Sequence, residues 1–255
     1  MIKTGMELAA AAKKIAANSK TLYVMGCFGA PLTSANKTRY TSNHSYNKQS
    51  SRTVKINAAS ANTFGFDCVG LIKGLLWGWS GDAAKTYGGA KYITNGVHDI
   101  NADSMISRCS GVSTNFSNIE IGEVVWMPGH IGIYIGDNKV VESTPSWDDG
   151  VQITTLGNIS KTGTYRVWKK HGKLPYINYT KQWKPTIGDI VDYHGNVHYA
   201  SANAAKASSC KGGKAKITNI YQLGKSKHPY HLVRLSGGGS NVYGWVDGGS
   251  FTKST

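Results

Sequence analysis

The chain has 255 residues, of which 40% are hydrophobic and 17% are charged, and its formal net charge is +15. This length allows two domains that each bury a core, and the composition is ordinary for a soluble protein. No apolar run approaches the length of a bilayer-spanning helix, so stable membrane insertion is not expected.

The positive charge calls for a polyanionic partner or for a tolerance of self-repulsion. Nucleic acid is not favoured, because no predicted helix has a dense Lys/Arg face and no nucleic-acid-binding motif is present in the sequence. The phosphate- and carboxylate-rich polymers of a bacterial envelope satisfy the same electrostatic requirement. We therefore expect anionic wall polymers, and no nucleic acid, as partners.

The N-terminal segment predicts a helix over residues 4–18. Thr4 is placed as the N-cap and Glu7 follows three residues later, which is the pattern of a capping box. The segment lacks the continuous apolar core and the cleavage site of a signal peptide.

Residues 32–62 are rich in Ser, Asn, Thr and Lys and contain few large apolar side chains. This composition predicts a long loop. Five basic residues and no acidic residue lie between Pro31 and Ser60: Lys37, Arg39, Lys48, Arg52 and Lys55. The loop could be a solvated excursion or a cationic lip on a substrate groove, and the sequence leaves both interpretations open.

A helix is predicted over residues 67–78, with Leu71, Leu75 and Leu76 at helical spacing. Cys68 would open this helix beside unpaired backbone N–H groups and the positive end of the helix dipole. Both features favour thiolate over thiol. The alternative is a buried structural cysteine.

A short helix near 102–109 precedes a series of predicted strands at 123–127, 130–135, 138–143, 151–155 and 164–168. Short turns of Gly, Asp and Asn separate several of these strands, which predicts an antiparallel meander.

His130 opens one of these strands, where an imidazole can project from the rim of the sheet. Glu142 lies twelve residues further on, and a tight turn at residues 136–138 would bring it back near His130. A carboxylate there would orient the ring through Nδ1 and stabilise the imidazolium. The alternative for Glu142 is an exposed carboxylate at a strand end.

Residues 170–185 have the composition of a linker, and the following segment has short strands with frequent Gly, which predicts a small β-barrel. Its aromatic side chains could form a stacking groove for a glycan or peptide, or the core of the barrel. They include Tyr193, Tyr199, Tyr221, Tyr230, Tyr243 and Trp245.

Cysteines stand at positions 27, 68, 109 and 210 with no Cys-x-x-Cys pair, which argues against zinc fingers and thioredoxin-like sites. His194 and His198 could share a metal only on a helix, and their segment is predicted as strand and turn. No metal and no cofactor are expected.

The order of the motifs resembles that of the NlpC-type cell-wall peptidases, a papain-like family. The motifs are Leu22-Tyr23-Val24-Met25-Gly26, Asp67-Cys68-Val69-Gly70-Leu71, Gly122-Glu123-Val124-Val125-Trp126 and His130-Ile131-Gly132-Ile133-Tyr134-Ile135-Gly136. The resemblance covers about residues 5–170. The chain departs from the family at Val69, where a serine is usual, and in the long insertion after Tyr23.

The resemblance implies an α+β fold, with a papain-like catalytic domain over residues 1–172 in which helices pack on a curled antiparallel sheet. A linker over 173–185 and a small all-β barrel over 186–255 would follow. The segment Tyr243-Gly244-Trp245-Val246 resembles the closing strand of bacterial Src-homology-3-like wall-binding domains.

The resemblance also assigns roles to individual residues. Cys68 would be the nucleophile, His130 the general base and later the acid, and Glu142 the residue that orients His130. Tyr23 would contact the oxyanion or the substrate backbone, unless it is only a core residue. Asp67 would meet a free amino group of the substrate, although its role as a helix N-cap is sufficient by itself.

The implied function is that of a peptidoglycan hydrolase, such as a phage endolysin or an autolysin, that cuts a stem-peptide amide next to D-glutamate. Two alternatives are an N-acetylmuramoyl-L-alanine amidase with the same three residues and a non-catalytic wall-binding protein. We expect a monomer that is made in the host cytoplasm and reaches the wall on lysis or by secretion.

Overall fold

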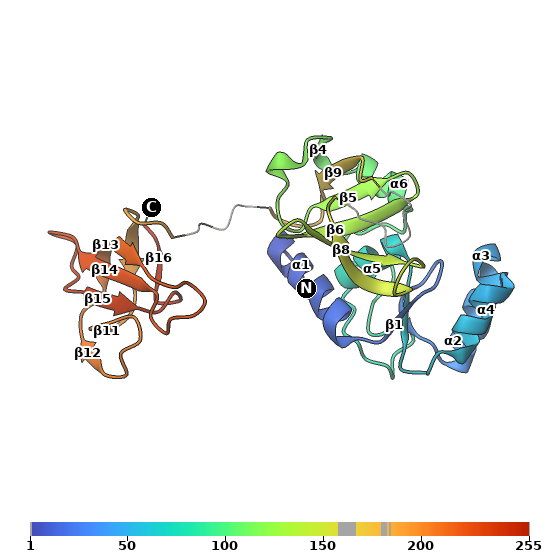
Figure 1. Ribbon diagram of the computed structural model, residues 1–255, viewed down its shortest axis with the longest axis horizontal. Coiled ribbons are helices and arrows are strands. Elements are labelled where there is room, and N and C mark those ends of the chain that lie inside the picture. Colours follow the sequence, from blue (N-terminus) through green and yellow to red (C-terminus); the bar gives the residue numbers. More distant parts are fainter. Residues whose placement is uncertain (1, 158–166, 180–182, 184, 255) are drawn as a thin grey trace. The chain divides into compact units, whose positions relative to one another are not determined.

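A division between Thr180 and Lys181 separates two units of the chain, each of which is described by itself (Figure 1). The computed structural model describes residues 2–157, 167–179, 183 and 185–254. The fold is mixed α+β, as the sequence predicts, with the described helices in the first unit and an all-β second unit.

The helices of the first unit are α1 (Gly5–Asn18), α2 (Ser34–Asn43), α3 (Ser45–Lys48), α4 (Ser50–Ala58), α5 (Cys68–Leu76), α6 (Ala102–Ser107) and the 3-10 turn η1 (Phe116–Asn118). A three-stranded sheet has the order β1-β3-β2 and consists of β1 (Thr21–Tyr23), β2 (Phe28–Pro31) and β3 (Phe64–Phe66). A six-stranded sheet has the order β4-β9-β5-β6-β7-β8 and consists of β4 (Ser110–Ser113), β5 (Val124–Met127), β6 (His130–Gly136), β7 (Lys139–Thr144), β8 (Gly150–Thr155) and β9 (Lys170–Lys173).

The capping box predicted at the start of α1 is confirmed. The Thr4 hydroxyl accepts from the backbone N–H of Glu7 at 3.2 Å, and the Glu7 carboxylate accepts from the backbone N–H of Thr4 at 3.0 Å. Leu8, Ala12 and Ile15 are buried on one face of the helix, which packs on β6, β7 and β8. No described helix has the length and apolarity required to cross a membrane.

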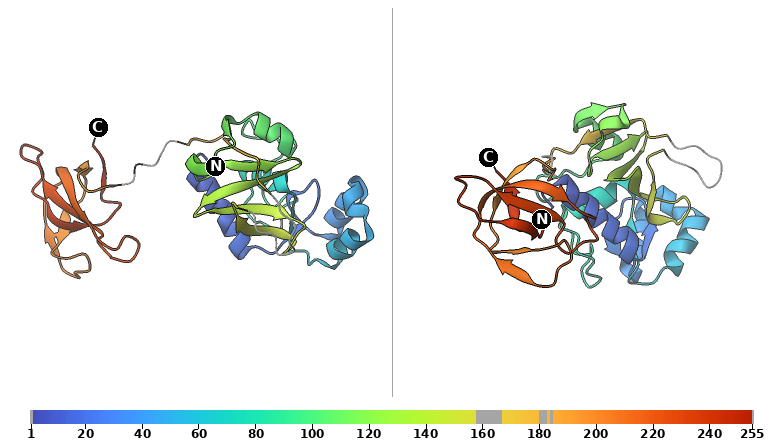
Figure 2. Two further views of the ribbon diagram at one scale, coloured as in Figure 1. Left: turned by 45° about the horizontal axis from the view of Figure 1, so that its top comes forward. Right: turned by 60° about the vertical axis from the view of Figure 1, so that its left-hand side comes forward.

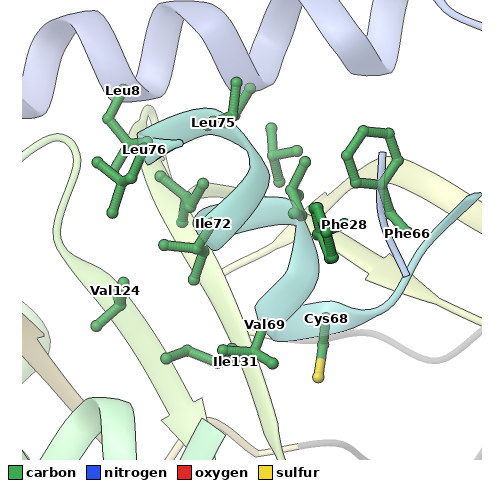
Figure 3. Packing of buried hydrophobic residues seen from close by; sticks show 14 of the residues in the cluster. Leu8, Phe28, Phe66, Cys68, Val69, Ile72, Leu75, Leu76, Val124 and Ile131 are labelled. Atoms are coloured by element: carbon green, nitrogen blue, oxygen red, sulfur yellow. The ribbon is translucent and has the colours of Figure 1, made fainter. Parts of the chain in front are cut away.

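The predicted helix that begins at Asp67 and Cys68 is also confirmed, as α5. All nine of its residues are buried, which matches its almost uninterrupted apolar sequence. It packs on β6 and β7, and Figure 3 shows Val69 beside Ile131 in the core formed under the helix. Together α1 and α5 cover one face of the six-stranded sheet, and this packing fixes the position of Cys68 at the end of the core.

The prediction of a long loop over residues 32–62 is wrong. The segment forms α2, α3 and α4, which gather at one edge of the first unit (Figure 1, Figure 2). The buried positions of these helices are largely polar, because Asn36, Asn47 and Arg52 are buried together with Tyr40 and Ile56. Their polar groups bond to backbone inside the unit. Asn47, for example, bonds to both the N–H and the C=O of Met25. A search for apolar periodicity therefore misses the helices.

The antiparallel meander is confirmed for β5 to β8, and α6 confirms the short helix. In the turn between β6 and β7, Gly136, Asp137 and Asn138 all have positive φ, at 87°, 51° and 58°. Of the strand predicted over 164–168, positions 164–166 lie outside the described residues, and 167–168 are not in a strand. The strand of this sheet that comes last in the chain is β9, which lies between β4 and β5 and pairs with both.

The predicted boundary at 172–173 lies too early in the chain. Residues 174–179 belong to the first unit, because Leu174 is buried in its core and Tyr179 donates its hydroxyl to the Gly122 carbonyl at 2.9 Å. The backbone of Asn178 also bonds to Lys3 and Gly5 near the N-terminus. The expected linker over 173–185 therefore includes packed residues of the first unit.

The second unit is one seven-stranded sheet with the order β12-β11-β15-β14-β13-β10-β16. Its strands are β10 (Ile190–Tyr193), β11 (Val197–Tyr199), β12 (Ala207–Ser209), β13 (Gly213–Ile220), β14 (Tyr230–Arg234), β15 (Tyr243–Val246) and β16 (Phe251–Lys253). Within the described residues the sheet has two edges, β12 and β16, and does not close into the expected barrel. The exposed three-residue strand β12 lies at one edge and, among the described strands, pairs only with β11. It does not pair with β16 at the other edge, so the sheet stays open.

A buried ion pair joins the helical insertion, the segment 32–62 that forms α2 to α4, to the rest of the first unit. The Arg52 guanidinium in α4 contacts Asp149 just before β8 at 2.6 Å and also donates to the Tyr23 carbonyl in β1. Lys55 contacts the same carboxylate at 2.7 Å, but its side chain is 53% exposed. The two cations share one anion and differ mainly in burial.

We predict that Arg52→Met lowers the free energy of unfolding of the first unit by about 3–5 kcal/mol, because a buried carboxylate loses its buried partner. Lys55→Met is the matched control and should cost less than about 1 kcal/mol, because water screens an exposed pair. Urea unfolding followed by the helical circular dichroism signal measures both. Equal losses for the two variants would contradict this account of the ion pair.

Candidate active site

Cys68 is the first residue of α5 and is 7% exposed. Its Sγ lies 4.0 Å from the Gly129 carbonyl oxygen, directly before β6, and the N–H of Ile131 also acts on the thiol. The Cys68 sulfur therefore lies next to the beginning of β6, the strand that His130 opens, although the two are some sixty residues apart in the chain.

The Cys68 thiol does not have the lowered pKa that its position at a helix start suggests. Burial, followed by the negative charge of Asp67, raises its pKa to about 12. The N–H groups of Ile131, Val69 and Cys68 itself act in the opposite direction and are outweighed. At rest the sulfur is a protonated thiol, so attack on a carbonyl requires a base that takes the proton.

His130 and Glu142 are in direct contact, as the twelve-residue spacing predicts. His130 Nε2 lies 2.5 Å from Glu142 Oε2, and Glu142 is fully buried. The prediction that the carboxylate meets Nδ1 is wrong, because Nε2 is the contacting nitrogen. The alternative interpretation of Glu142 as an exposed strand-end carboxylate is excluded by its burial.

The register of the β6–β7 hairpin explains how Glu142 reaches His130. In the β6–β7 hairpin Ile133 pairs with Val141 and Tyr134 with Val140, which puts Glu142 on the same face as His130 and diagonal to it. A glutamate is long enough to span this diagonal, and the bulge between Tyr134 and Gly136 adjusts the hairpin end.

Two further side chains hold this pair, and sequence analysis did not identify either of them. Thr154 in β8 donates its hydroxyl to Glu142 Oε1 at 2.6 Å, so both carboxylate oxygens are held. Trp168 is buried and stacks on the His130 ring, with centroids 5.5 Å apart and planes 18° apart. Thr154 follows Glu142 by the same twelve residues that separate Glu142 from His130, a repeat that was visible in the sequence.

Asp67 acts as the N-cap of α5. Its Oδ1 accepts from the Gly70 N–H at 2.5 Å and its Oδ2 accepts from the Gly26 N–H at 2.7 Å. Burial raises the pKa of this carboxyl, and the two backbone donors oppose that shift. Each oxygen therefore already holds one amide, which accounts for the residue without any substrate amine.

Tyr23 lies at the end of β1 and is 5% exposed. Burial raises the pKa of its hydroxyl, and the charges of Asp67 and of Cys68 in its thiolate form raise it further, so the phenol lies within their electrostatic reach and stays protonated. The ring packs edge-on against Tyr46, with centroids 5.8 Å apart. The hydroxyl contacts the Met25 sulfur at 3.9 Å, a weak contact that an oxyanion could replace.

All four cysteines carry free thiols. Cys27 is fully buried in a small apolar cluster that also contains Val24, Ala30, Leu32, Tyr40 and Ile56. Within the described part of the chain, no group of three or more His, Cys, Asp or Glu side chains is placed to hold a metal ion.

In the second unit the aromatic residues divide between core and surface. Tyr193 and Tyr230 are buried in the core. Tyr221, Trp245, His231 and Tyr243 form a row in which adjacent ring centroids lie 6.1, 5.3 and 5.6 Å apart. Tyr221 and Tyr243 are 46% and 61% exposed, so rings at both ends of the row are open to solvent.

A comparison with protein-family models gives no match for the chain, and a comparison with curated proteins gives none either.

We predict that alkylation of Cys68 by iodoacetamide is slow at neutral pH and accelerates roughly tenfold per pH unit between about pH 6 and 9. The sign follows from the raised pKa, because only the thiolate reacts and its fraction grows as pH approaches that value. Peptide mapping by mass spectrometry separates Cys68 from the other three cysteines, and Cys68→Ser is the control. A rate that levels off below about pH 8 would show a thiolate at rest.

Proposed function

We propose that this chain is a cysteine hydrolase that cuts an amide bond in the peptide part of peptidoglycan. The observation that carries the proposal is the buried His130–Glu142 pair at the start of β6, beside the thiol at the start of α5. The papain-like arrangement implied by the sequence motifs is part of this proposal.

The mechanism begins with proton transfer from Cys68 Sγ to the His130 ring as sulfur attacks the substrate carbonyl. Because Nε2 faces Glu142, we assign the transfer to Nδ1, and the buried carboxylate stabilises the imidazolium that forms. The C–N bond then breaks, and the imidazolium protonates the leaving amine. Water, deprotonated by the same imidazole, hydrolyses the thioester and restores the thiol.

Backbone donors and Tyr23 would stabilise the oxyanion. The N–H of Cys68 is one of the groups that already act on the sulfur, and it lies at the N-terminus of α5, where helix N–H groups lack partners within the helix. The protonated Tyr23 hydroxyl is the second candidate donor, since its present partner is only a thioether.

We assign the cut to the bond next to D-glutamate in the stem peptide, following the sequence resemblance. The amide between muramic acid and L-alanine is the second candidate, because the orienting residue is the carboxylate of Glu142. A wall-binding protein without activity is the third candidate, because a buried His–carboxylate pair can also be structural, as His171 and Glu123 show in the same unit.

The expected result of digesting purified peptidoglycan is a new D-glutamyl carboxylate and a new free amine, both identified by mass spectrometry of the products. A free L-alanine amine with intact muramic acid would instead show the amidase. Cys68→Ser should abolish release of either product while the circular dichroism spectrum stays unchanged. Release at near wild-type rate by this variant would remove Cys68 from the mechanism.

The second unit is proposed to be an Src-homology-3-like domain that holds the enzyme on the wall. Residues 186–255 carry a net charge of +5, from seven Lys and one Arg against three Asp. The unit has its own core and an aromatic row on its surface. Tethering would raise the effective concentration of the catalytic unit at an insoluble substrate.

We predict that residues 181–255 fused to a fluorescent protein sediment with purified walls. Salt should weaken the binding in part, because the charge component is screened and ring stacking is not. Tyr243→Ala should reduce the salt-resistant part severalfold, whereas Ile187→Ala, an equally exposed apolar residue outside the row, should leave it unchanged. A fusion that stays in the supernatant at low salt would contradict the assignment.

A further inference from the structure

A cavity of about 270 Å³ lies between α2 and the loop that precedes β2. Arg39, Asn43 and His44 contribute to it from α2 and the residue after it, and Gly26 contributes from the loop. The mechanism described above does not use this cavity. Its volume equals about nine water molecules at ~30 Å³ each, which is the size of one amino-acid residue.

Aromatic rings form much of its wall. Phe28 packs on Tyr87 and Tyr92, with centroids 4.8 and 5.8 Å apart. Phe28 and Tyr40 are buried, while Tyr92 is 51% exposed. The cavity therefore has aromatic rings in its wall and a partly open rim, but most of its exposed lining is polar, which suits a compact group with polar atoms.

Two charged side chains line the cavity, and within the described part of the chain only one of them, Asp99, has a partner of opposite charge. Asp99 is matched, because Lys73 and the Tyr92 hydroxyl both bond to its carboxylate. The Arg39 guanidinium donates to the Tyr87 hydroxyl at 2.7 Å and lies over the Tyr87 ring, but no acidic side chain among the described residues forms an ion pair with it. Among the described residues, the exposed Arg39 side chain thus lines an aromatic cavity without an acidic ion-pair partner of its own.

Two residues, Gly26 and Asp67, connect the cavity to Cys68. The Gly26 N–H donates to Asp67 Oδ2, and Asp67 caps the helix that begins at Cys68. Gly26 has φ +79° and packs so closely on the His44 ring that any Cβ at this position would overlap it. A ligand in the cavity would therefore contact the same loop that supports the helix of Cys68.

We propose that this cavity binds a carboxylate-bearing residue of the peptide substrate, with Arg39 as the carboxylate-binding group. This inference rests on the proposed function for the identity of the substrate as a wall peptide. A guanidinium presents parallel N–H donors that match a carboxylate, and the aromatic wall takes the body of the residue. The helical insertion thus provides a specificity subsite instead of a general cationic lip.

The test uses the full chain with Cys68→Ser, so that peptides bind without being cut. Synthetic wall peptides with all carboxyl groups free are compared with versions amidated at one carboxyl at a time, and binding is measured by calorimetry. The same peptides are measured in Cys68→Ser/Arg39→Met. Lys48→Met is the matched control, because Lys48 is an exposed cation on the same insertion that does not line the cavity.

Arg39→Met should weaken binding of the free peptide by about 10- to 100-fold, the size of a charge-assisted hydrogen bond. One amidation should cause a similar loss, and the two changes together should cause no further loss. Lys48→Met should bind like the parent. The subsite is ruled out if Arg39→Met binds the free peptide as tightly as the parent, if no amidation matters, or if no peptide binds.

Hydrolysis by the chain with Cys68 intact separates this inference from the proposed function. If the chain cuts the peptides and Arg39→Met leaves KM unchanged, the subsite is wrong and the proposed function stands. If peptides bind through Arg39 but none is cut, the subsite stands and the hydrolase assignment is wrong.

Discussion

The carboxylate of Asp67 holds two backbone amides at once, one at the start of α5 and one in the loop at Gly26. It thereby sets the start of the helix that carries Cys68 and fixes the loop between β1 and β2. Because this carboxylate is buried, each of its two bonds is costly to lose. The position of Cys68 and the wall of the Arg39 cavity both depend on it.

Burial also decides the chemistry of the site. It raises the pKa of the Cys68 thiol despite the helix N-terminus, so in the proposed mechanism a base, His130, must take the thiol proton. The same burial leaves Glu142 without water, and its oxygens are held instead by His130 and Thr154. In the proposed mechanism this carboxylate would stabilise the positive charge that the His130 ring gains when it takes the thiol proton.

Local patterns were enough to predict α1, α5 and the β5–β8 meander, because a capping box, a long apolar run and short Gly/Asp/Asn turns specify them. They also predicted the contact between His130 and Glu142. They could not reveal α2 to α4, whose buried face uses Asn36, Asn47 and Arg52 in place of apolar residues. The lowered pKa expected for Cys68 failed for a related reason, since sequence shows a helix start but not the packing that buries it. No local sequence pattern marks Trp168 as the residue that stacks on His130.

We propose a mechanism in which Cys68 forms a covalent acyl-enzyme with the wall peptide. Its most direct test is to mix the chain with soluble peptidoglycan fragments, quench within milliseconds to seconds in acid, and map the cysteine peptides by mass spectrometry. The account predicts a transient acyl adduct on Cys68 alone, whose mass equals that of the acyl half of the cut fragment and which disappears at later times. Turnover with no adduct on Cys68 at any time, or with an adduct on another residue, would contradict it.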